Sequence, residues 1–278
     1  MRGFKDMLPG MAVYVQYLTD IQFVPYYSPP FDYFEYVDSS DVRWDLPIIS
    51  NAFAESIGPI VDIACGWGRV SLHLISRGHD VVAVDQSAVA IDRLAKLAGN
   101  VATHVGGLAP VTSDALHFFR GRRDEFGGAV IGDISINAFN DERVLRDLLA
   151  SVYTALNPGA RFVLSVLKSR RLQQLIELDG KPFRVHFSFE DGRSSEMITA
   201  LLFSEATGEL TQNCYIPSGE AVSKPIFSTI REKMWDASEV QTILSQTGFE
   251  SESSIVIKIP KGGLEGAEVE VLVLRTRS

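Results

Sequence analysis

The sequence has few of the residues that hold disulfide-bonded or metal-bound proteins together. Its 278 residues include two cysteines, Cys65 and Cys214, which lie far apart in the chain. Two such cysteines form neither a disulfide framework nor a cysteine-rich metal cluster, so we expect no metal site. Because free thiols persist in a reducing compartment, we expect a cytoplasmic protein.

Long apolar runs and concentrated positive charge are also missing. No uninterrupted apolar stretch approaches the roughly 18 residues of a membrane span. Asp6 and the Pro9-Gly10 pair interrupt the N-terminal region, where a signal peptide needs a clean apolar run. The formal net charge is -9, and we interpret the short basic clusters at 120–123 and 168–171 as solvated loop ends. We therefore expect neither a membrane nor a nucleic-acid partner.

Residues 59–87 are the most informative stretch. The short apolar run 60–64 predicts a buried strand, residues 69–76 have helical spacing, and residues 81–84 predict a second buried strand. Gly66 and Gly68 lie in the first turn, where glycine permits positive φ and close approach of a ligand. Asp85 follows the second strand, where a carboxylate can accept hydrogen bonds from both ribose hydroxyls. This pattern predicts a β-loop-α-β unit that binds a nucleoside.

Two details decide between a dinucleotide and another nucleoside cofactor. The loop lacks the third small residue of the G-x-G-x-x-G dinucleotide fingerprint, and Asp62 lies inside the first strand. A carboxylate there repels pyrophosphate but favours a cation, such as the ammonium or sulfonium of S-adenosylmethionine. A non-enzymatic or NAD-linked Rossmann protein is therefore the more distant alternative.

Several segments resemble the class I S-adenosylmethionine-dependent methyltransferases. Residues 61–68 (Val-Asp-Ile-Ala-Cys-Gly-Trp-Gly) and 84–87 (Val-Asp-Gln-Ser) resemble motif I and post-motif I of that superfamily. Residues 129–139, 144–156 and 157–165 resemble its strand four, the following helix and strand five, with an Asn-Pro-Gly turn before the last. The resemblance implies an α/β fold with a Rossmann-like seven-stranded core, S-adenosyl-L-methionine as cofactor and S-adenosyl-L-homocysteine as product.

The candidate cofactor-binding residues of this core follow its strands. Asp114 is placed where the family offers a carboxylate to the adenine amino group, provided that the strand ends within 111–116. If the Gly-rich stretch 104–107 is the strand instead, the assignment of Asp114 fails. The candidates are Asp62, Ala64, Gly66, Gly68, Asp85, Gln86, Ser87, Asp114, Ala115 and Gly132.

The remaining segments predict parts outside the core. Residues 1–50 are rich in aromatics and form either an arm packed on the core or a lid over the cofactor, with Tyr33 and Arg43 as cofactor-binding candidates beside Trp44. We expect the core in residues 51–170 and 235–278, with a helix capped by Asp236 and a final antiparallel strand pair.

Residues 171–234 show alternating runs and turn signals of an antiparallel β insertion between strand five and the last helix. This layout resembles small-molecule N-methyltransferases, above all those that dimethylate deoxyaminosugars, in which such an insertion roofs the acceptor site. The alternative role is a homodimer contact.

Methyl transfer requires little more than alignment of nucleophile, carbon and sulfur and exclusion of water. An amine acceptor must arrive unprotonated, so a nearby base or a desolvating pocket helps. Asp133, after strand four, and His186, in the insertion, are the catalytic candidates. For His186, a hydrogen-bonded structural role is the alternative.

The sequence therefore predicts an enzyme that transfers one or two methyl groups to an amine of a natural product. An amino sugar and the terminal amine of a peptide, as in daptide-type tailoring, both fit, because an acidic surface accepts a cationic amine. O-methylation of a hydroxyl or carboxyl group uses the same core and stays open as the alternative.

Overall fold

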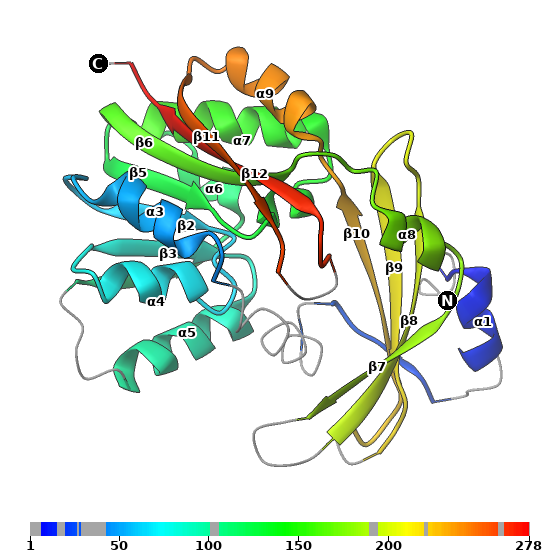
Figure 1. The fold of residues 1–278 in the computed structure, drawn as a ribbon. Coiled ribbons are helices and arrows are strands. Elements are labelled where there is room, and N and C mark those ends of the chain that lie inside the picture. The colour runs from blue at the N-terminus through cyan, green and yellow to red at the C-terminus, as the bar shows by residue number, and fades with distance from the viewer. Residues whose placement is uncertain are drawn as a thin grey trace. The chain divides into compact units, whose positions relative to one another are not determined.

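The computed structural model describes residues 7–15, 20–26, 28, 43–100, 106–188, 194–219, 222–260 and 264–277. The chain divides into two compact units, each with its own sheet (Figure 1). The core unit comprises Ser39–Arg170 and Trp235–Ser278, and the five-stranded unit comprises Met1–Asp38 and Arg171–Met234. The sequence predicts residues 1–50 as one segment outside the core. In the structure, residues 39–50 belong to the core unit, and residues 1–38 group with the insertion.

The core unit contains a seven-stranded sheet in the order β11-β12-β6-β5-β2-β3-β4. The strands from β6 to β4 in this order are parallel, and β12 and β11 close the sheet as an antiparallel pair. This confirms the predicted class I methyltransferase fold. The bounds are β2 (Ile60–Ile63), β3 (Val81–Asp85), β4 (Leu108–Thr112), β5 (Phe126–Ile131), β6 (Leu156–Leu167), β11 (Glu250–Lys258) and β12 (Glu268–Arg275).

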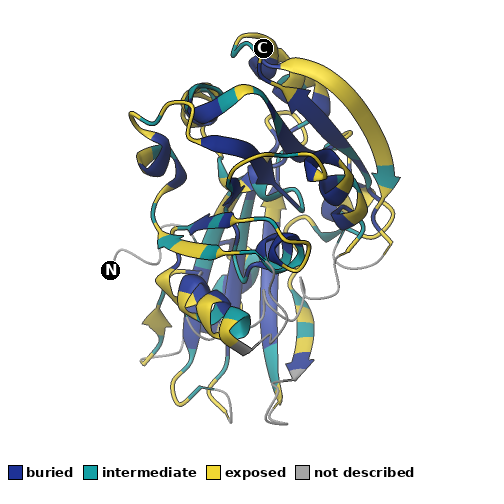
Figure 2. Ribbon diagram, turned by 90° about the vertical axis from the view of Figure 1, so that its left-hand side faces the viewer, coloured by how far each residue is buried: buried dark blue, intermediate teal, exposed yellow. Residues whose placement is uncertain are grey.

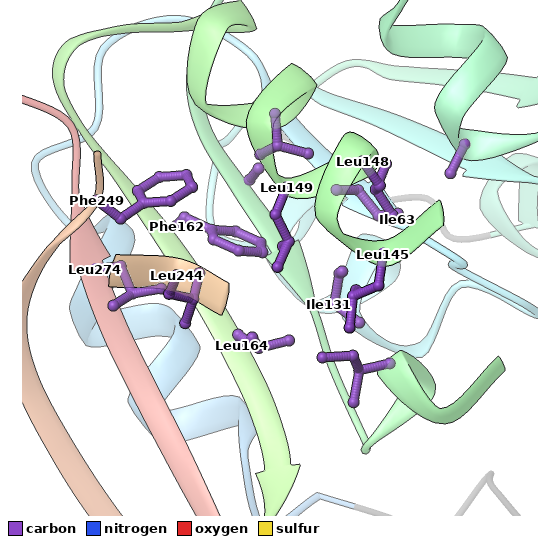
Figure 3. Packing of buried hydrophobic residues seen from close by; sticks show 14 of the residues in the cluster. Ile63, Ile131, Leu145, Leu148, Leu149, Phe162, Leu164, Leu244, Phe249 and Leu274 are labelled. Atoms are coloured by element: carbon purple, nitrogen blue, oxygen red, sulfur yellow. The ribbon is translucent and has the colours of Figure 1, made fainter. Parts of the chain in front are cut away.

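Helices cover both faces of this sheet because its central strands are apolar on both sides. Side chains alternate along β6, so that Phe162 and Leu164 pack with one buried cluster (Figure 3) and Val163 packs with the other. Each fully buried side chain of this size contributes about 1.5–3 kcal/mol. The first face is covered by α6 (Ala115–Phe119), α7 (Glu142–Ala155) and α9 (Ala237–Ser245), the second by α3 (Leu46–Phe53), α4 (Arg69–Ile75) and α5 (Ala88–Asn100).

The five-stranded unit has the strand order β1-β10-β9-β8-β7 and is antiparallel except for the β1–β10 pair. Met11 and Val15 of the short helix α1, together with the preceding Leu8, pack against one face of this sheet. The amide of Leu8 donates to Asn213 Oδ1 at 2.7 Å. The predicted antiparallel strands of the insertion are confirmed. The bounds are α1 (Pro9–Val15), β1 (Gln22–Phe23), α8 (Gln173–Leu178), β7 (Phe183–Ser188), β8 (Ser194–Phe203), β9 (Glu209–Ile216) and β10 (Ile226–Lys233).

Burial follows this organisation (Figure 2). The central strands β2 and β5 are buried along their whole length, whereas the edge strand β11 is exposed along almost all of its length. Glutamate and serine side chains make the first half of β11 polar, whereas Ile255 and Val256 in its second half are exposed. Among the residues that the structure describes, no helix combines the length and apolar character needed to cross a membrane.

Candidate functional site

The carboxyl ends of β5, β2, β3 and β4 lie side by side, because these neighbouring strands are parallel. We call this the carboxyl edge. Ligands of open α/β sheets bind in the crevice outside the carboxyl ends of the strands. Most of the predicted site residues follow these ends: Ala64, Gly66 and Gly68 after β2; Asp85, Gln86 and Ser87 at β3; Asp114 and Ala115 after β4; Gly132 and Asp133 after β5.

The turn between β2 and α4 requires its glycines for different reasons. Gly66 has φ +52°, and a Cβ added there would meet nothing within 4 Å, so its backbone is open to a ligand. Gly68 has φ +82°, and a Cβ there would lie 2.1 Å from Leu94 Cδ1 on α5. Ala64 also has positive φ, 54°, although it is not glycine. The turn is therefore held in a conformation that combines open backbone with close helix packing.

Asp85 joins this turn to the end of β3. Its Oδ2 accepts a hydrogen bond from the Gly66 amide at 2.8 Å, and its Oδ1 accepts one from the Ser87 amide at 2.8 Å. Burial raises the pKa of the Asp85 carboxyl above its usual value, while these amides oppose the shift. The Gln86 amide also donates a hydrogen bond to the carboxylate. A carboxylate has about four acceptor positions, so at least one remains for a ribose hydroxyl. Gln86 is exposed, and Ser87 Oγ accepts from the Ala90 amide at 3.2 Å in the first turn of α5.

Asp62 is buried inside the core unit. Asp62 is 2% exposed. Its Oδ2 accepts hydrogen bonds from the amide and the hydroxyl of Ser71, at 3.0 and 2.6 Å. Burial raises the pKa of the Asp62 carboxyl to about 7, although Ser71 and the nearby Arg69 lower it. These bonds tie β2 to α4. The predicted contact of Asp62 with the cationic part of the cofactor stays a prediction.

Strand β4 ends just before Asp114. The strand spans Leu108–Thr112, so the alternative strand at 104–107 is wrong for Gly106 and Gly107; residues 101–105 lie outside the described residues. Asp114 is exposed and caps α6, its Oδ1 accepting from the His117 amide at 2.9 Å, while Ala115 is buried. The role of Asp114 toward adenine stays a prediction.

The turn after β5 is strained and packed against a buried ion pair. Asp133 and Ile134 have φ of 47° and 52°, and such a conformation costs a non-glycine residue on the order of 1–3 kcal/mol. Asp45, which is fully buried, accepts from Arg69 at 2.5 and 2.8 Å and from the Asp133 amide at 3.1 Å. Burial lowers the pKa of Arg69, but the bond to Asp45 and the charges of Asp133 and Asp62 outweigh this and raise it.

The remaining candidates lie elsewhere. Tyr33 is outside the described residues. Arg43 is exposed just before Asp45, and the partly buried Trp44 packs against the core cluster on the α3 face. His186 lies on β7 in the five-stranded unit with a 75% exposed side chain, its Nε2 3.6 Å from Glu196 Oε2. This is a surface pair across two strands, which fits the structural alternative for His186.

Sequence reasoning missed Asp45, Arg69 and Ser71. Arg69 directly follows the second glycine, and Ser71 lies nine positions after Asp62. A buried strand acid followed by a serine in the next helix could have indicated the Asp62 bond. Asp45 directly precedes the first residue of α3, and nothing local in the sequence indicates its partner 24 positions away.

The carboxyl edge fits an S-adenosyl cofactor. The open backbone of Gly66 leaves room for a ligand, and the partly buried Asp85 supplies acceptor positions beside it. The negative charge of the Asp85 carboxylate at this edge also favours a ligand that carries positive charge over one that carries pyrophosphate.

Comparison with known proteins agrees with this fit. Residues 60–159, which include β2 to β5 and the turns that follow them, match a family model described as a methyltransferase domain. No curated protein sequence matches the chain.

Solved structures share the fold at low sequence identity. An S-adenosylmethionine-dependent methyltransferase from Clostridium acetobutylicum is 14% identical, with a TM-score of 0.66 over 89% of this chain and 99% of that chain. The glycopeptide N-methyltransferase MtfA, in complex with S-adenosyl-L-homocysteine, is 22% identical, with a TM-score of 0.57 over 98% and 99%. DesVI from Streptomyces venezuelae is 15% identical, with a TM-score of 0.59 over 87% and 91%. Residues 60–159 therefore match a methyltransferase domain, the chain has the class I methyltransferase fold, and the carboxyl edge fits S-adenosylmethionine as cofactor.

Proposed function

We propose that the chain transfers methyl groups, one or two per acceptor, to an amine of a natural product such as an amino sugar or a peptide. The observation that carries this proposal is the match to a glycopeptide N-methyltransferase over 98% of this chain and 99% of that chain. That match extends well beyond the methyltransferase domain at 60–159 and includes the five-stranded unit. The formal net charge of -9 also favours a cationic amine as acceptor.

The residues of the carboxyl edge would hold the cofactor, which supplies an electrophilic methyl group when bound. Gly66 leaves its backbone open, and Asp85 has an acceptor position for a ribose hydroxyl beyond those taken by the amides of Gly66, Gln86 and Ser87. Fixing the nucleoside in this way reduces the entropy cost of aligning the methyl group with its acceptor. The chain's own contribution to catalysis is then mainly alignment.

Asp133 is the residue that we assign to the acceptor. It lies after β5 at the carboxyl edge, and its carboxylate interacts electrostatically with Arg69. A carboxylate in this position can accept a hydrogen bond from an amine and thereby orient the lone pair of the amine nitrogen toward the methyl group. His186 stays a second prediction, as it lies in the five-stranded unit.

We assign acceptor recognition to the five-stranded unit, because it lies outside the matched methyltransferase domain. A lid role for residues 1–50 and a homodimer contact through the insertion stay predictions. We also propose a cytoplasmic location, because the thiols of Cys65 and Cys214 are typical of a reducing compartment.

Incubation with methyl-labelled S-adenosylmethionine and paired acceptors tests the proposal. Each pair consists of an amino sugar or amine-ended peptide and its hydroxyl analogue, and mass spectrometry reads the mass gain. We expect gains of one or two methyl groups on the amines, because a neutral amine is a better nucleophile than a hydroxyl without a strong base. Methylation confined to the hydroxyl analogues would contradict the proposal and establish O-methylation.

A further inference from the structure

The ion pair between Asp45 and Arg69 touches the turn after β5 directly. Both residues belong to the core unit, and Asp45 precedes α3 while Arg69 begins α4. The carboxylate of Asp45 accepts from both terminal nitrogens of Arg69 and also from the Asp133 amide, through Oδ2 at 3.1 Å. A Cβ added to Gly132 would lie 3.2 Å from Asp45 Oδ2 and 3.2 Å from Arg69 Nη2. The backbone of 132–133 therefore packs closely against the pair, and a side chain at 132 would require a neighbouring side chain to shift.

The turn that the ion pair contacts has an intrinsically unfavourable backbone conformation. Asp133 and Ile134 both have positive φ, which is most unfavourable for the β-branched Ile134. Local bonds contribute, since the Ser135 amide donates to the Gly132 carbonyl and the Asn137 amide donates to the Ile134 carbonyl. Strained residues of this kind persist where the surroundings over-determine them, and such strain clusters at functional sites.

Helix capping does not account for the position of Asp45 in this ion pair. Asp45 makes no side-chain cap bond to α3, although it stands at the N-cap position. A buried ion pair is weak evidence for stability, because desolvation offsets much of the attraction. Its contact with Asp133 gives it a different role.

We propose that Asp45 and Arg69 are positioning residues, which hold the Gly132–Ile134 backbone so that Asp133 faces its acceptor in a single orientation. The amide of Asp133 is fixed by Asp45, and the guanidinium of Arg69 fixes the Asp45 carboxylate. Neither residue is assigned a contact with the reacting atoms. The role of Asp133 toward the acceptor rests on the proposed function. The restraint of the Gly132–Ile134 backbone by Asp45 and Arg69 does not depend on that role.

Two variants and a matched control separate positioning from stability. Asp45→Ala removes the acceptor of the Asp133 amide and the carboxylate that pairs with the buried Arg69. The double variant Asp45→Ala/Arg69→Met also removes the charge, so it keeps the test available where the single variant does not fold. Glu252→Gln is the control, because it breaks another two-bond pair of the same unit, in which Arg161 Nη2 and Nε contact Glu252 at 2.7 and 2.9 Å.

Hydrogen exchange of the apoprotein measures the hold directly. In the double variant we expect the Asp133 amide to exchange at least tenfold faster than in the wild type, and in Glu252→Gln to exchange at the wild-type rate. With an amine acceptor, kcat should fall at least tenfold in the double variant, whereas the Kd of S-adenosylhomocysteine should change less than threefold.

Unchanged exchange at Asp133 in the folded double variant would overturn the proposal. So would faster exchange with unchanged kcat, or an equal loss of kcat in Glu252→Gln. If the wild type methylates no amine, the proposed function fails, while the exchange rates still decide whether the pair holds the turn.

Discussion

Asp85→Asn should lower the affinity for S-adenosylhomocysteine about 30- to 100-fold, as measured by calorimetric titration. The carboxylate accepts from the Gly66, Gln86 and Ser87 amides and has at least one position left for a ribose hydroxyl. The asparagine amide nitrogen cannot accept, so one oxygen must serve all of these donors. Hydrogen bonds to charged groups are worth about 1.5–3 kcal/mol each, and losing one or more of them gives a change of about this size.

Asp80→Asn is the matched control for this measurement. Asp80 precedes the other end of β3 and also accepts from a glycine amide, that of Gly107, at 2.8 Å. Because it lies away from the carboxyl edge, we expect its substitution to change the affinity less than twofold. Wild-type affinity in a folded Asp85→Asn variant would remove Asp85 from the cofactor site.

Asp62→Asn should make the core unit more stable than the wild type at pH 8 but not at pH 4. The folded pKa of Asp62 is about 7, against an ordinary value of 3.8, because burial disfavours the charged form. Between these values the folded state binds the proton more tightly than the unfolded state, so stability falls as pH rises through this window. The substituted asparagine cannot ionise and can still accept from Ser71, so the variant avoids a cost on the order of 3–4 kcal/mol above pH 7.

Free energies of unfolding from denaturant titrations at several pH values give the measurement. The advantage of Asp62→Asn should grow from pH 4 to pH 8. Ser71→Ala gives a second check, because the Ser71 hydroxyl lowers the pKa of Asp62, and its removal should extend the loss of stability to higher pH. A difference between Asp62→Asn and wild type that stays constant over this range would contradict the assignment.

The sequence was sufficient for elements whose signals are local. The apolar run before Gly66 predicted β2, the glycines predicted the turn, and Asp85 was correctly placed at the end of β3. The turn signals within residues 171–234 likewise predicted antiparallel pairs such as β8 and β9. In each case the residues that determine the structure lie within a few positions of each other.

What the sequence could not show depends on contacts between distant residues. The bond of Asp45 to Arg69 spans 24 positions, and the bond of Asp45 to Asp133 spans 88. Asp133 and Ile134 adopt a left-handed conformation although neither is glycine, so no residue type in the sequence indicates it. Such conformations depend on the surrounding tertiary contacts. The pairing of β1 with β10 explains why residues before 39 group with the insertion and not with the core unit.

Thermal unfolding with different nucleosides tests most directly that the carboxyl edge binds an S-adenosyl cofactor. Ligand that binds only the folded state stabilises it by about 2.7 kcal/mol at 100 times its Kd. We expect saturating S-adenosylhomocysteine to raise the Tm of the wild type by several degrees, and NAD to leave it unchanged. A rise with NAD and none with S-adenosylhomocysteine would contradict the account.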